Sequence, residues 1–284
     1  MGGPRYWMER AVVRISVVIP TRDRARDLRR CLDALTECAR RLDGSDSRAK
    51  LHQVIVVDDA SVTGHATAVA RSSPLPVEIL RSRDRMGAGA SRRLGVELAT
   101  GDVLAFLDDD AAPRGDWLIQ AATVDDGSPA ITGRVLCFDF GLLSRARQAR
   151  YDARYARLER DATVGFFAGG NSAVLTEVFH EVGGFSQEGT GGDNSLARSL
   201  AERGTPVRFR PELVIAHRNG KGWRRALSDA WSSGRQQAGR MTASEGLRAL
   251  RDGAVGGTRT IREVNRALGA VHVLGRLTAP RGVR

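Results

Sequence analysis

Two groups of aspartates stand directly after apolar segments in the first half of the chain. The pair 58–59 follows the segment 53–57, and the triplet 108–110 follows the segment 103–107. Carboxylate oxygens are the ligands that hard divalent cations prefer, and Mg²⁺ typically takes one or two of them and completes its shell with water and substrate phosphates. The pattern therefore indicates a Mg²⁺ or Mn²⁺ site that holds a diphosphate.

The aspartate triplet has the better spacing for a metal. In an extended chain, residues i and i+2 project to the same side, so Asp108 and Asp110 can address one ligand. The simplest alternative is an acidic turn that caps a helix near Trp117, because aspartates are favoured at helix N-termini. A second aspartate group at another strand end favours the metal site over that alternative.

These aspartates need a sheet that brings several strand ends together. Apolar, β-branched runs alternate with segments of helical period, which predicts βαβ units and a mostly parallel sheet. Ligands bind such sheets at the carboxyl ends of the strands, which is where both aspartate groups fall. The expected strands are 14–19, 53–57, 77–80 and 103–107, and the expected helices are 25–42, 63–71 and 89–99.

The regular alternation ends at Pro113. An apolar, glycine-broken stretch, 163–175, is suited to lining a pocket, and a glycine-rich loop, 183–192, is a candidate lid. From residue 222 the chain is helical and basic, and 243–284 is expected to form loosely packed helices. The other expected strands are 130–138, 207–209 and 213–216, and the other expected helices are 142–159 and 194–203.

The basic charge of the chain is unusual in its make-up. The 284 residues carry a formal net charge of +11, and lysine occurs only at Lys50 and Lys221, so nearly all of the positive charge is arginine. Aspartate and glutamate are interspersed with these arginines in most segments. This distribution favours a solvated basic surface over a dedicated polyanion patch, and we expect no nucleic-acid partner.

The cysteines and the hydropathy bear on location. Cys31, Cys38 and Cys137 form neither a disulfide framework nor a metal-ligand pattern, and the first two fall on the apolar stripe of the helix 25–42. No segment is long enough to span a bilayer, and no signal-cleavage pattern follows the first apolar run. These features predict a cytoplasmic protein.

One segment leaves a membrane contact open. Trp223, Leu227 and Trp231 share one face of a predicted helix that also carries arginines, so residues 222–242 are a candidate for peripheral contact with the inner membrane surface. The alternative is a helix that packs its aromatic face on the α/β domain that precedes it.

Several motifs occur in a fixed order along residues 15–217. They are VVIPTRDR at 17–24, VIVVDDAS at 54–61, the segment 84–101 with Gly87, Arg92 and Gly95, FLDDD at 106–110, Gly170-Asn171, VGGF at 182–185 and Gly192-Asp193. Together they resemble the family 2 glycosyltransferases, inverting enzymes of the GT-A fold with a DXD-type metal motif. The resemblance implies an α/β, Rossmann-like, mostly parallel sheet flanked by helices, with a C-terminal helical extension.

The resemblance implies a nucleoside-diphosphate-sugar donor, with UDP as the favoured nucleotide. Asp59 would bind the base, and the backbone around Pro20, Thr21 and Arg22 would hold base and ribose. The alternative for Asp59 is an Asx-turn after the strand.

The same resemblance implies how the diphosphate and the metal are held. Gly87 and Arg92 would help position the nucleotide, although a helical arginine is more often only solvated. Asp108, with Asp109 beside it, would lie near the ribose and diphosphate, and Asp110 would be the principal ligand of Mn²⁺ or Mg²⁺.

Two residues of the second half complete the expected site. Asp193 matches the catalytic base of the family, which takes the proton of the acceptor hydroxyl as it attacks the anomeric carbon. The alternative is that Asp193 only caps the helix that begins at Asn194. His217 ends an apolar strand and would complete the metal shell or contact the diphosphate, although an isolated histidine is usually a core or surface residue.

Some positions depart from the family pattern. Arg22 stands where an aromatic is frequent, Arg85 and Arg93 replace asparagines, Ala60 replaces a glycine, and Gly192 replaces the acid before the base. Glu188 is a fallback partner for the acceptor. These departures concern the substrate more than the type of reaction.

We therefore predict a metal-dependent glycosyltransferase that moves a sugar from a nucleoside-diphosphate sugar to an acceptor hydroxyl with inversion. Residues 1–221 would form the GT-A domain, with a nucleotide-sugar-binding half at 1–113 and an acceptor-binding half at 114–221, and 222–284 the helical basic extension. The acceptor stays open among secondary metabolites, glycans, peptides and lipid-linked molecules. The alternatives are a nucleotidyltransferase acting on a sugar phosphate and a basic, non-enzymatic binder of nucleic acid or membrane.

Overall fold

A computed structural model describes residues 12–185, 192–218, 222–236 and 241–278. The chain divides into two compact units. One, the sheet unit, comprises Met1–Arg134 and Glu159–Ala216, and the other, the helical unit, comprises Val135–Leu158 and His217–Arg284. Each unit is described by itself.

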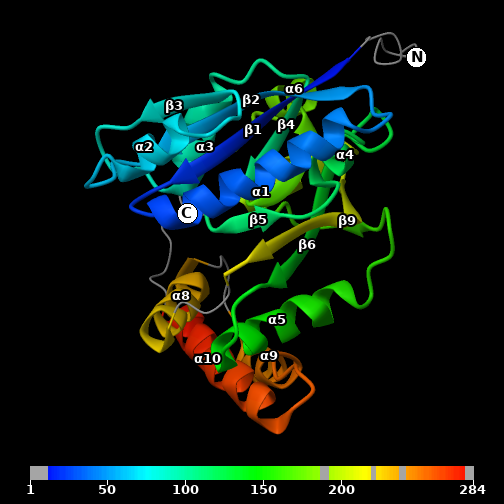
Figure 1. The fold of residues 1–284 in the computed structure, drawn as a ribbon. Coiled ribbons are helices and arrows are strands. Elements are labelled where there is room, and N and C mark those ends of the chain that lie inside the picture. The colour runs from blue at the N-terminus through cyan, green and yellow to red at the C-terminus, as the bar shows by residue number, and fades with distance from the viewer. Residues whose placement is uncertain (1–11, 186–191, 219–221, 237–240, 279–284) are drawn as a thin grey trace. The chain divides into compact units, whose positions relative to one another are not determined.

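The first half of the sheet unit is a parallel β-sheet with helical crossovers (Figure 1). The strands lie in the order β3-β2-β1-β4, and all three pairs are parallel. The prediction of βαβ units is confirmed, strand by strand and helix by helix. The elements are β1 (Val13–Thr21), α1 (Ala25–Asp43), β2 (Ala49–Asp58), α2 (His65–Arg71), β3 (Val77–Arg81), α3 (Ala88–Val96) and β4 (Val103–Leu107).

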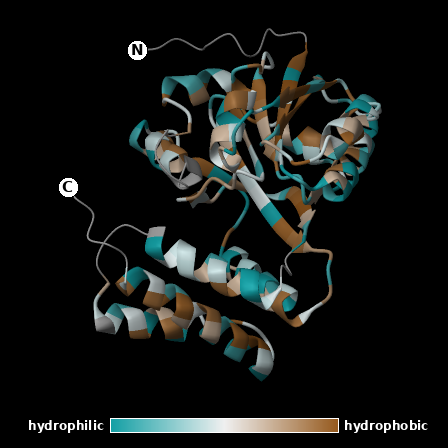
Figure 2. Cartoon of the chain, turned by 90° about the vertical axis from the view of Figure 1, so that its left-hand side faces the viewer, coloured by the Kyte–Doolittle hydropathy of each residue, from teal (hydrophilic) through white to brown (hydrophobic). Residues whose placement is uncertain are grey.

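The helices of this half are fixed by apolar stripes and one close approach. The stripe of α1 is fully buried, Cys31 and Cys38 included, as its helical spacing predicts. On α3, a Cβ added at Gly95 would lie 2.5 Å from Cγ1 of Val18 and 3.1 Å from Cγ2 of Val57, so only glycine lets this helix approach the sheet so closely. Figure 2 shows the corresponding concentration of apolar residues on the strands.

The second half of the sheet runs antiparallel. Strand β8 pairs with β4 and β6 in antiparallel register, and β9 and β5 complete the order β4-β8-β6-β9-β5, with β7 paired to β9. The added elements are β5 (Ala111–Pro113), α4 (Trp117–Ala121), β6 (Ala130–Cys137), β7 (Thr163–Val164), β8 (Asn171–Leu175), α6 (Thr176–Glu181), α7 (Gly192–Glu202) and β9 (Val207–His217).

The prediction of two short strands at 207–209 and 213–216 was wrong, because β9 is continuous. The polar residues between them do not break the strand, since each finds an ionic partner in the loop before β7. Arg210 pairs with Asp161, and Glu212 pairs with Arg160 at 2.8 Å. This continuity matters for the site, because β9 ends at His217.

The helical unit contains α5 (Leu142–Tyr155), α8 (Trp223–Gln236), α9 (Ala243–Asp252) and α10 (Arg259–Leu277). Its core is formed by Ala146, Ile261, Val264 and Leu268. A Cβ at Gly234 would lie 2.0 Å from the carbonyl oxygen of His272, and one at Gly275 would lie 2.5 Å from that of Trp231, so α8 and α10 touch backbone to backbone. The prediction of loosely packed helices is therefore wrong for α10, which packs closely on α8.

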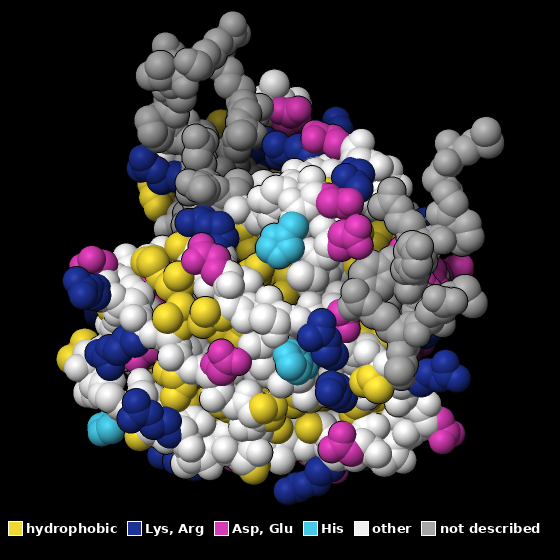
Figure 3. All heavy atoms as spheres, turned by 90° about the horizontal axis from the view of Figure 1, so that it is seen from above, with side chains coloured by type: hydrophobic (Ala, Val, Ile, Leu, Met, Phe, Trp, Pro, Cys, Tyr) yellow, Lys and Arg dark blue, Asp and Glu magenta, His cyan; other side chains and the backbone are white. Residues whose placement is uncertain are grey.

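The surface of the described residues carries both signs of charge. Figure 3 shows basic and acidic side chains interspersed over the face seen from above. On α8, Trp223, Leu227 and Trp231 are 48%, 40% and 37% exposed. Within the described ranges, every helix is too short or too polar to cross a bilayer.

Candidate metal centre and nucleotide pocket

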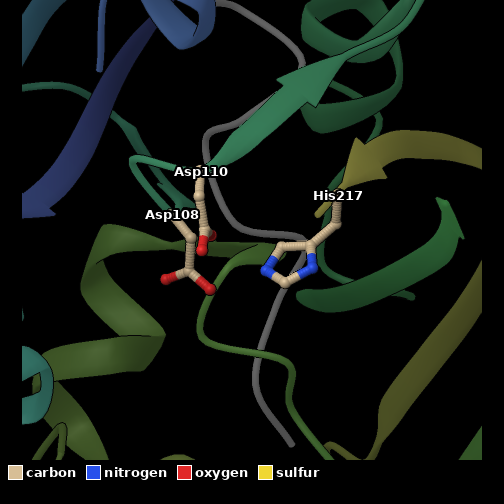
Figure 4. Close-up of side chains that lie close together, drawn as sticks. All are labelled: Asp108, Asp110 and His217. Atoms are coloured by element: carbon tan, nitrogen blue, oxygen red, sulfur yellow. The ribbon is translucent and has the colours of Figure 1, made fainter. Parts of the chain in front are cut away.

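Three of the predicted site residues meet at one point (Figure 4). One ligand atom each of Asp108, Asp110 and His217 can be chosen so that all three lie within 4.8 Å of one another. The aspartates follow β4, and the histidine is the last residue of β9. The ends of two strands therefore supply all three side chains. Asp110 and His217 are buried, and Asp108 is partly exposed. Two carboxylates and an imidazole in this arrangement can bind a divalent cation.

The acidic-turn alternative for the triplet was wrong. The residue that precedes α4 is Asp116, and the triplet lies earlier, between β4 and β5. The triplet is therefore not engaged in capping a helix.

Asp108 is held from two sides. Arg92, which is buried on α3, donates from Nη2 to Oδ1 of Asp108 at 2.6 Å. On the other side, a Cβ added at Gly170 would lie 2.2 Å from Oδ2 and 2.4 Å from Cγ of Asp108. Arg92 thus contacts the aspartate triplet through an ion pair, which is more than the solvated helical arginine of the alternative interpretation.

Gly170→Ala is expected to displace the Asp108 carboxylate, because the added methyl group would occupy its position while Arg92 holds its other oxygen. We expect the affinity of the site for Mn²⁺ to fall roughly 10-fold or more, as for changes in the groups that orient metal ligands. Isothermal titration with Mn²⁺ measures this affinity. Gly165→Ala is the matched control, because a Cβ at Gly165 meets no atom within 4 Å; equal affinities in the two variants would contradict the expectation.

Asp109 is turned toward the end of β1. Its carboxylate accepts hydrogen bonds from Oγ1 of Thr21 at 2.8 Å and from Nη1 of Arg24 at 3.0 Å. The same Arg24 nitrogen donates to Oδ2 of Asp110 at 3.1 Å. Burial raises the pKa of Asp109 to about 6, although the charge of Arg24 and the hydrogen bond from Thr21 oppose the shift.

Arg24 was missed by the sequence analysis. It precedes α1 directly, and its position after the carboxyl end of β1 is the signal that could have placed it beside the aspartate triplet. Through Arg24 and Thr21, the loop after β1 is tied to the loop after β4.

Asp59 also contacts a neighbouring loop. Its two carboxylate oxygens accept hydrogen bonds from the backbone N–H groups of Met86, at 2.6 Å, and Gly87, at 2.9 Å. Gly87 directly precedes α3 with a φ of 84°, a conformation that favours glycine. Asp59 thus fixes the loop that carries Gly87, at the edge where Asp108 and Arg92 also lie.

Asp58, the residue before Asp59, forms the turn after β2. The N–H of Ser61 donates to Oδ1 of Asp58, three residues earlier, at 2.9 Å, so the side chain that closes this turn is that of Asp58 and not that of Asp59. Ala60 has a φ of 53°, a left-handed conformation that costs an alanine about 1–2 kcal/mol and that the glycine usual in the family would adopt freely.

The side chain of Asn171 connects α4, β6 and β9. Its side-chain amide donates to the carbonyl oxygens of Arg134 and Leu213, both at 3.0 Å, and its Oδ1 accepts from Nε1 of Trp117 at 2.8 Å. It is fully buried. One side chain on β8 therefore bonds the backbones of β6 and β9, and β9 carries His217.

Not every predicted residue joins these contacts. Pro20 lies in β1, and Arg22 pairs with Asp23 at 3.5 Å. Asp193 lies in the first turn of α7, but its side chain is outside the described residues, and so is Glu188. The base role of Asp193 and the contacts of Pro20 and Arg22 with a nucleotide stay predictions.

Comparison with known proteins agrees with this arrangement of motifs. Residues 16–183 match the model of the family described as glycosyl transferase family 2. The pre-mycofactocin glycosyltransferase of Mycobacterium tuberculosis is 29% identical over 215 residues, which cover 72% of this chain and 42% of that protein. The glycosyltransferase AglE of Haloferax volcanii is 26% identical over 210 residues, which cover 72% of this chain and 66% of that protein. The chain thus spans less than half of the mycobacterial relative.

Solved structures share the fold. The mannosyltransferase PcManGT from Pyrobaculum calidifontis, solved in complex with GDP-Man and Mn²⁺, superposes with a TM-score of 0.59 at 21% identity over 94% of this chain and 72% of that one. GalNAc-T7 with UDP, GalNAc and Mn²⁺ gives a TM-score of 0.56 at 16% identity over 89% of this chain and 56% of that one. The predicted GT-A fold is therefore confirmed. Because the family model matches more than half of its length and its neighbours are GT-A glycosyltransferases, the chain belongs to glycosyl transferase family 2.

Proposed function

We propose that this glycosyltransferase moves a sugar from a nucleoside-diphosphate sugar, with UDP as the favoured nucleotide, to an acceptor hydroxyl with inversion and with the help of a divalent cation. The observation that carries the proposal is the cluster of Asp108, Asp110 and His217 at the carboxyl edge of the sheet. The nucleotides named with the solved neighbours, GDP-Man, UDP and UDP-GlcNAc, support a nucleotide-sugar donor.

The donor set favours Mn²⁺ over Mg²⁺. Mg²⁺ prefers oxygen ligands in a strict octahedron, whereas one of the three ligands here is an imidazole. Mn²⁺ likewise accepts carboxylate and water oxygens. As a softer cation than Mg²⁺, it also accepts an imidazole nitrogen beside them. When bound, a cation at this cluster would stabilise the negative charge that develops on the leaving diphosphate.

The arginines around the triplet have a defined part in this proposal. Arg92 pairs with Asp108, and Arg24 bridges Asp109 and Asp110. A carboxylate can hold an arginine through one oxygen and a cation through the other, so these pairs fix the direction of the carboxylates without excluding a metal. They also add positive charge beside the expected diphosphate, which favours its binding.

Asp193 is the proposed base. It would accept the proton of the acceptor hydroxyl as the oxygen attacks the anomeric carbon, and a carboxylate suits this task when the proton is transferred within hydrogen-bond distance. Its place at the beginning of α7 puts it on a regular element rather than in the preceding loop.

A thermal-shift titration tests the donor and the metal together. We expect UDP to raise the unfolding midpoint by several degrees in the presence of Mn²⁺, since ligand at a hundredfold excess over Kd contributes about 2.7 kcal/mol. GDP and dTDP serve as the comparison, and the same titrations with EDTA serve as the control. A nucleotide shift that is identical with Mn²⁺ and with EDTA would contradict metal-dependent donor binding.

A further inference from the structure

The helical unit contains a cavity of about 450 Å³ that the transferase site does not use. Its lining comes from all four helices of the unit, α5, α8, α9 and α10, which lie side by side in Figure 1. The volume falls within the range of small-molecule sites, which is about 300–1,000 Å³.

One wall of this cavity is strongly basic. Arg147, Arg150 and Arg154 lie on one face of α5, at i, i+3 and i+7, and all three line the cavity. The guanidinium of Arg147 also lies 5.9 Å from the centre of the Tyr151 ring. Among the described residues that line the cavity, the one carboxylate is Asp229, and it pairs with Arg225 at 2.8 Å.

The positive charges that line the cavity repel one another. The Arg150 side chain is exposed, but partial desolvation by its neighbours lowers its pKa, and the charges of Arg154 and Arg147 lower it further. Burial likewise lowers the pKa of His272 on the facing helix α10, and the charge of Arg150 adds to that shift. Like charges three and four residues apart destabilise a helix, so a bound anion would relieve a repulsion that the ligand-free protein carries.

Another part of the lining is apolar, and one acceptor in it is unsatisfied. Leu268 and Val273 of α10 and Ala230 of α8 line the cavity. Asn265, 1% exposed, donates to the carbonyl oxygens of Ala146 and Val255, while its Oδ1 has no hydrogen-bond partner among the described residues. A ligand with both a charged and an apolar end fits such a cavity better than a bare ion.

We propose that this cavity binds an organic phosphate, with the phosphate against the three arginines of α5 and the apolar body against α10. Phosphate suits this wall because a doubly charged group with several acceptor oxygens can bond more than one guanidinium at once. The proposal is independent of the transferase function, since every lining residue belongs to the helical unit.

Isothermal titration of the full chain with phenyl phosphate and with inorganic phosphate tests the proposal. We expect phenyl phosphate to bind more tightly, because its ring covers the apolar wall. Arg150→Gln should weaken phenyl phosphate binding roughly 10-fold or more, the usual effect of losing a hydrogen bond to a charged group. Arg145→Gln is the matched control, because Arg145 lies on the same helix but outside the cavity lining; it should bind as the unchanged protein does.

A third variant, Asp110→Asn, distinguishes the cavity from the transferase site. It alters the expected metal centre and should leave phenyl phosphate binding intact. The proposal is overturned if Arg150→Gln, shown to be folded by its circular dichroism, binds phenyl phosphate as tightly as Arg145→Gln does. It is also overturned if the two phosphates bind equally well. Vesicles of phosphatidylcholine with and without phosphatidic acid distinguish the source of the ligand. Vesicle binding that needs phosphatidic acid and is lost in Arg150→Gln identifies a lipid phosphate. If the protein binds phenyl phosphate but not these vesicles, the ligand is a free solute.

Discussion

Asp110→Asn is expected to lower the affinity for Mn²⁺ roughly 100-fold or more and to remove metal-dependent donor binding. The substitution keeps the shape of the side chain but replaces one of the two carboxylates near His217 by a neutral amide, and changes even beyond the direct ligands of a metal typically cost 10–100-fold in affinity. It also removes the negative charge of residue 110, with which Arg24 pairs. Isothermal titration with Mn²⁺, followed by UDP at saturating Mn²⁺, measures both effects.

The control for this variant is Asp126→Asn, which removes one carboxylate from an exposed position of the same unit. It raises the formal net charge of the chain by one, as Asp110→Asn does, so it corrects for any general electrostatic effect on cation binding. An unchanged Mn²⁺ affinity in Asp110→Asn would remove the aspartate triplet from the metal centre.

Asp193→Asn is expected to lower turnover about 10²–10⁴-fold while leaving the Kd of the donor unchanged, because a general base contributes on this scale and acts after the donor has bound. The assignment rests on the family resemblance of the Gly192-Asp193 motif. A coupled assay of nucleotide release in the presence of acceptor gives kcat, and titration with UDP and Mn²⁺ gives the affinity.

Glu202→Gln, at the other end of α7, is the control for the loss of an acidic residue from this helix. The helix begins at Gly192, so Asp193 lies inside its first turn and not at the cap expected for a helix that begins at Asn194. If Asp193 has only a structural part in that turn, its asparagine variant should keep full turnover. That outcome would assign the base to another residue.

The sheet could be predicted from the sequence because its signals are local. Each parallel strand is an apolar β-branched run, and the apolar stripe of α1 has helical spacing, so element types follow without knowledge of the fold. The break predicted within β9 failed for the opposite reason. Arg210 and Glu212 are compatible with a strand only through their partners Asp161 and Arg160, which lie about 50 residues earlier in the chain.

The same distinction, between local signals and contacts set by the tertiary structure, applies to the candidate site. The place of Asp108 and Asp110 at the carboxyl edge of the sheet followed from the strand-end rule. The nearness of His217 to them was implied by the family resemblance, and the structure confirms it. The same rule could have placed Arg24, which follows the carboxyl end of β1, beside the triplet. The hydrogen bonds of Asp59 to the loop before α3 could not be predicted, since they join loops whose paths only the tertiary structure sets. The packing of α8 on α10 was missed because glycine has no side chain whose pattern could reveal a contact face.

The position of Asn171 has a consequence for how a ligand would meet this enzyme. Its amide bonds the carbonyl oxygen of Leu213 and so fixes, within the folded core, the strand that ends in His217. The conformational entropy lost in gathering the three groups is therefore spent during folding and not on binding. Less of the binding free energy of a cation is then lost in ordering its ligands, which favours a higher affinity of the site for the cation.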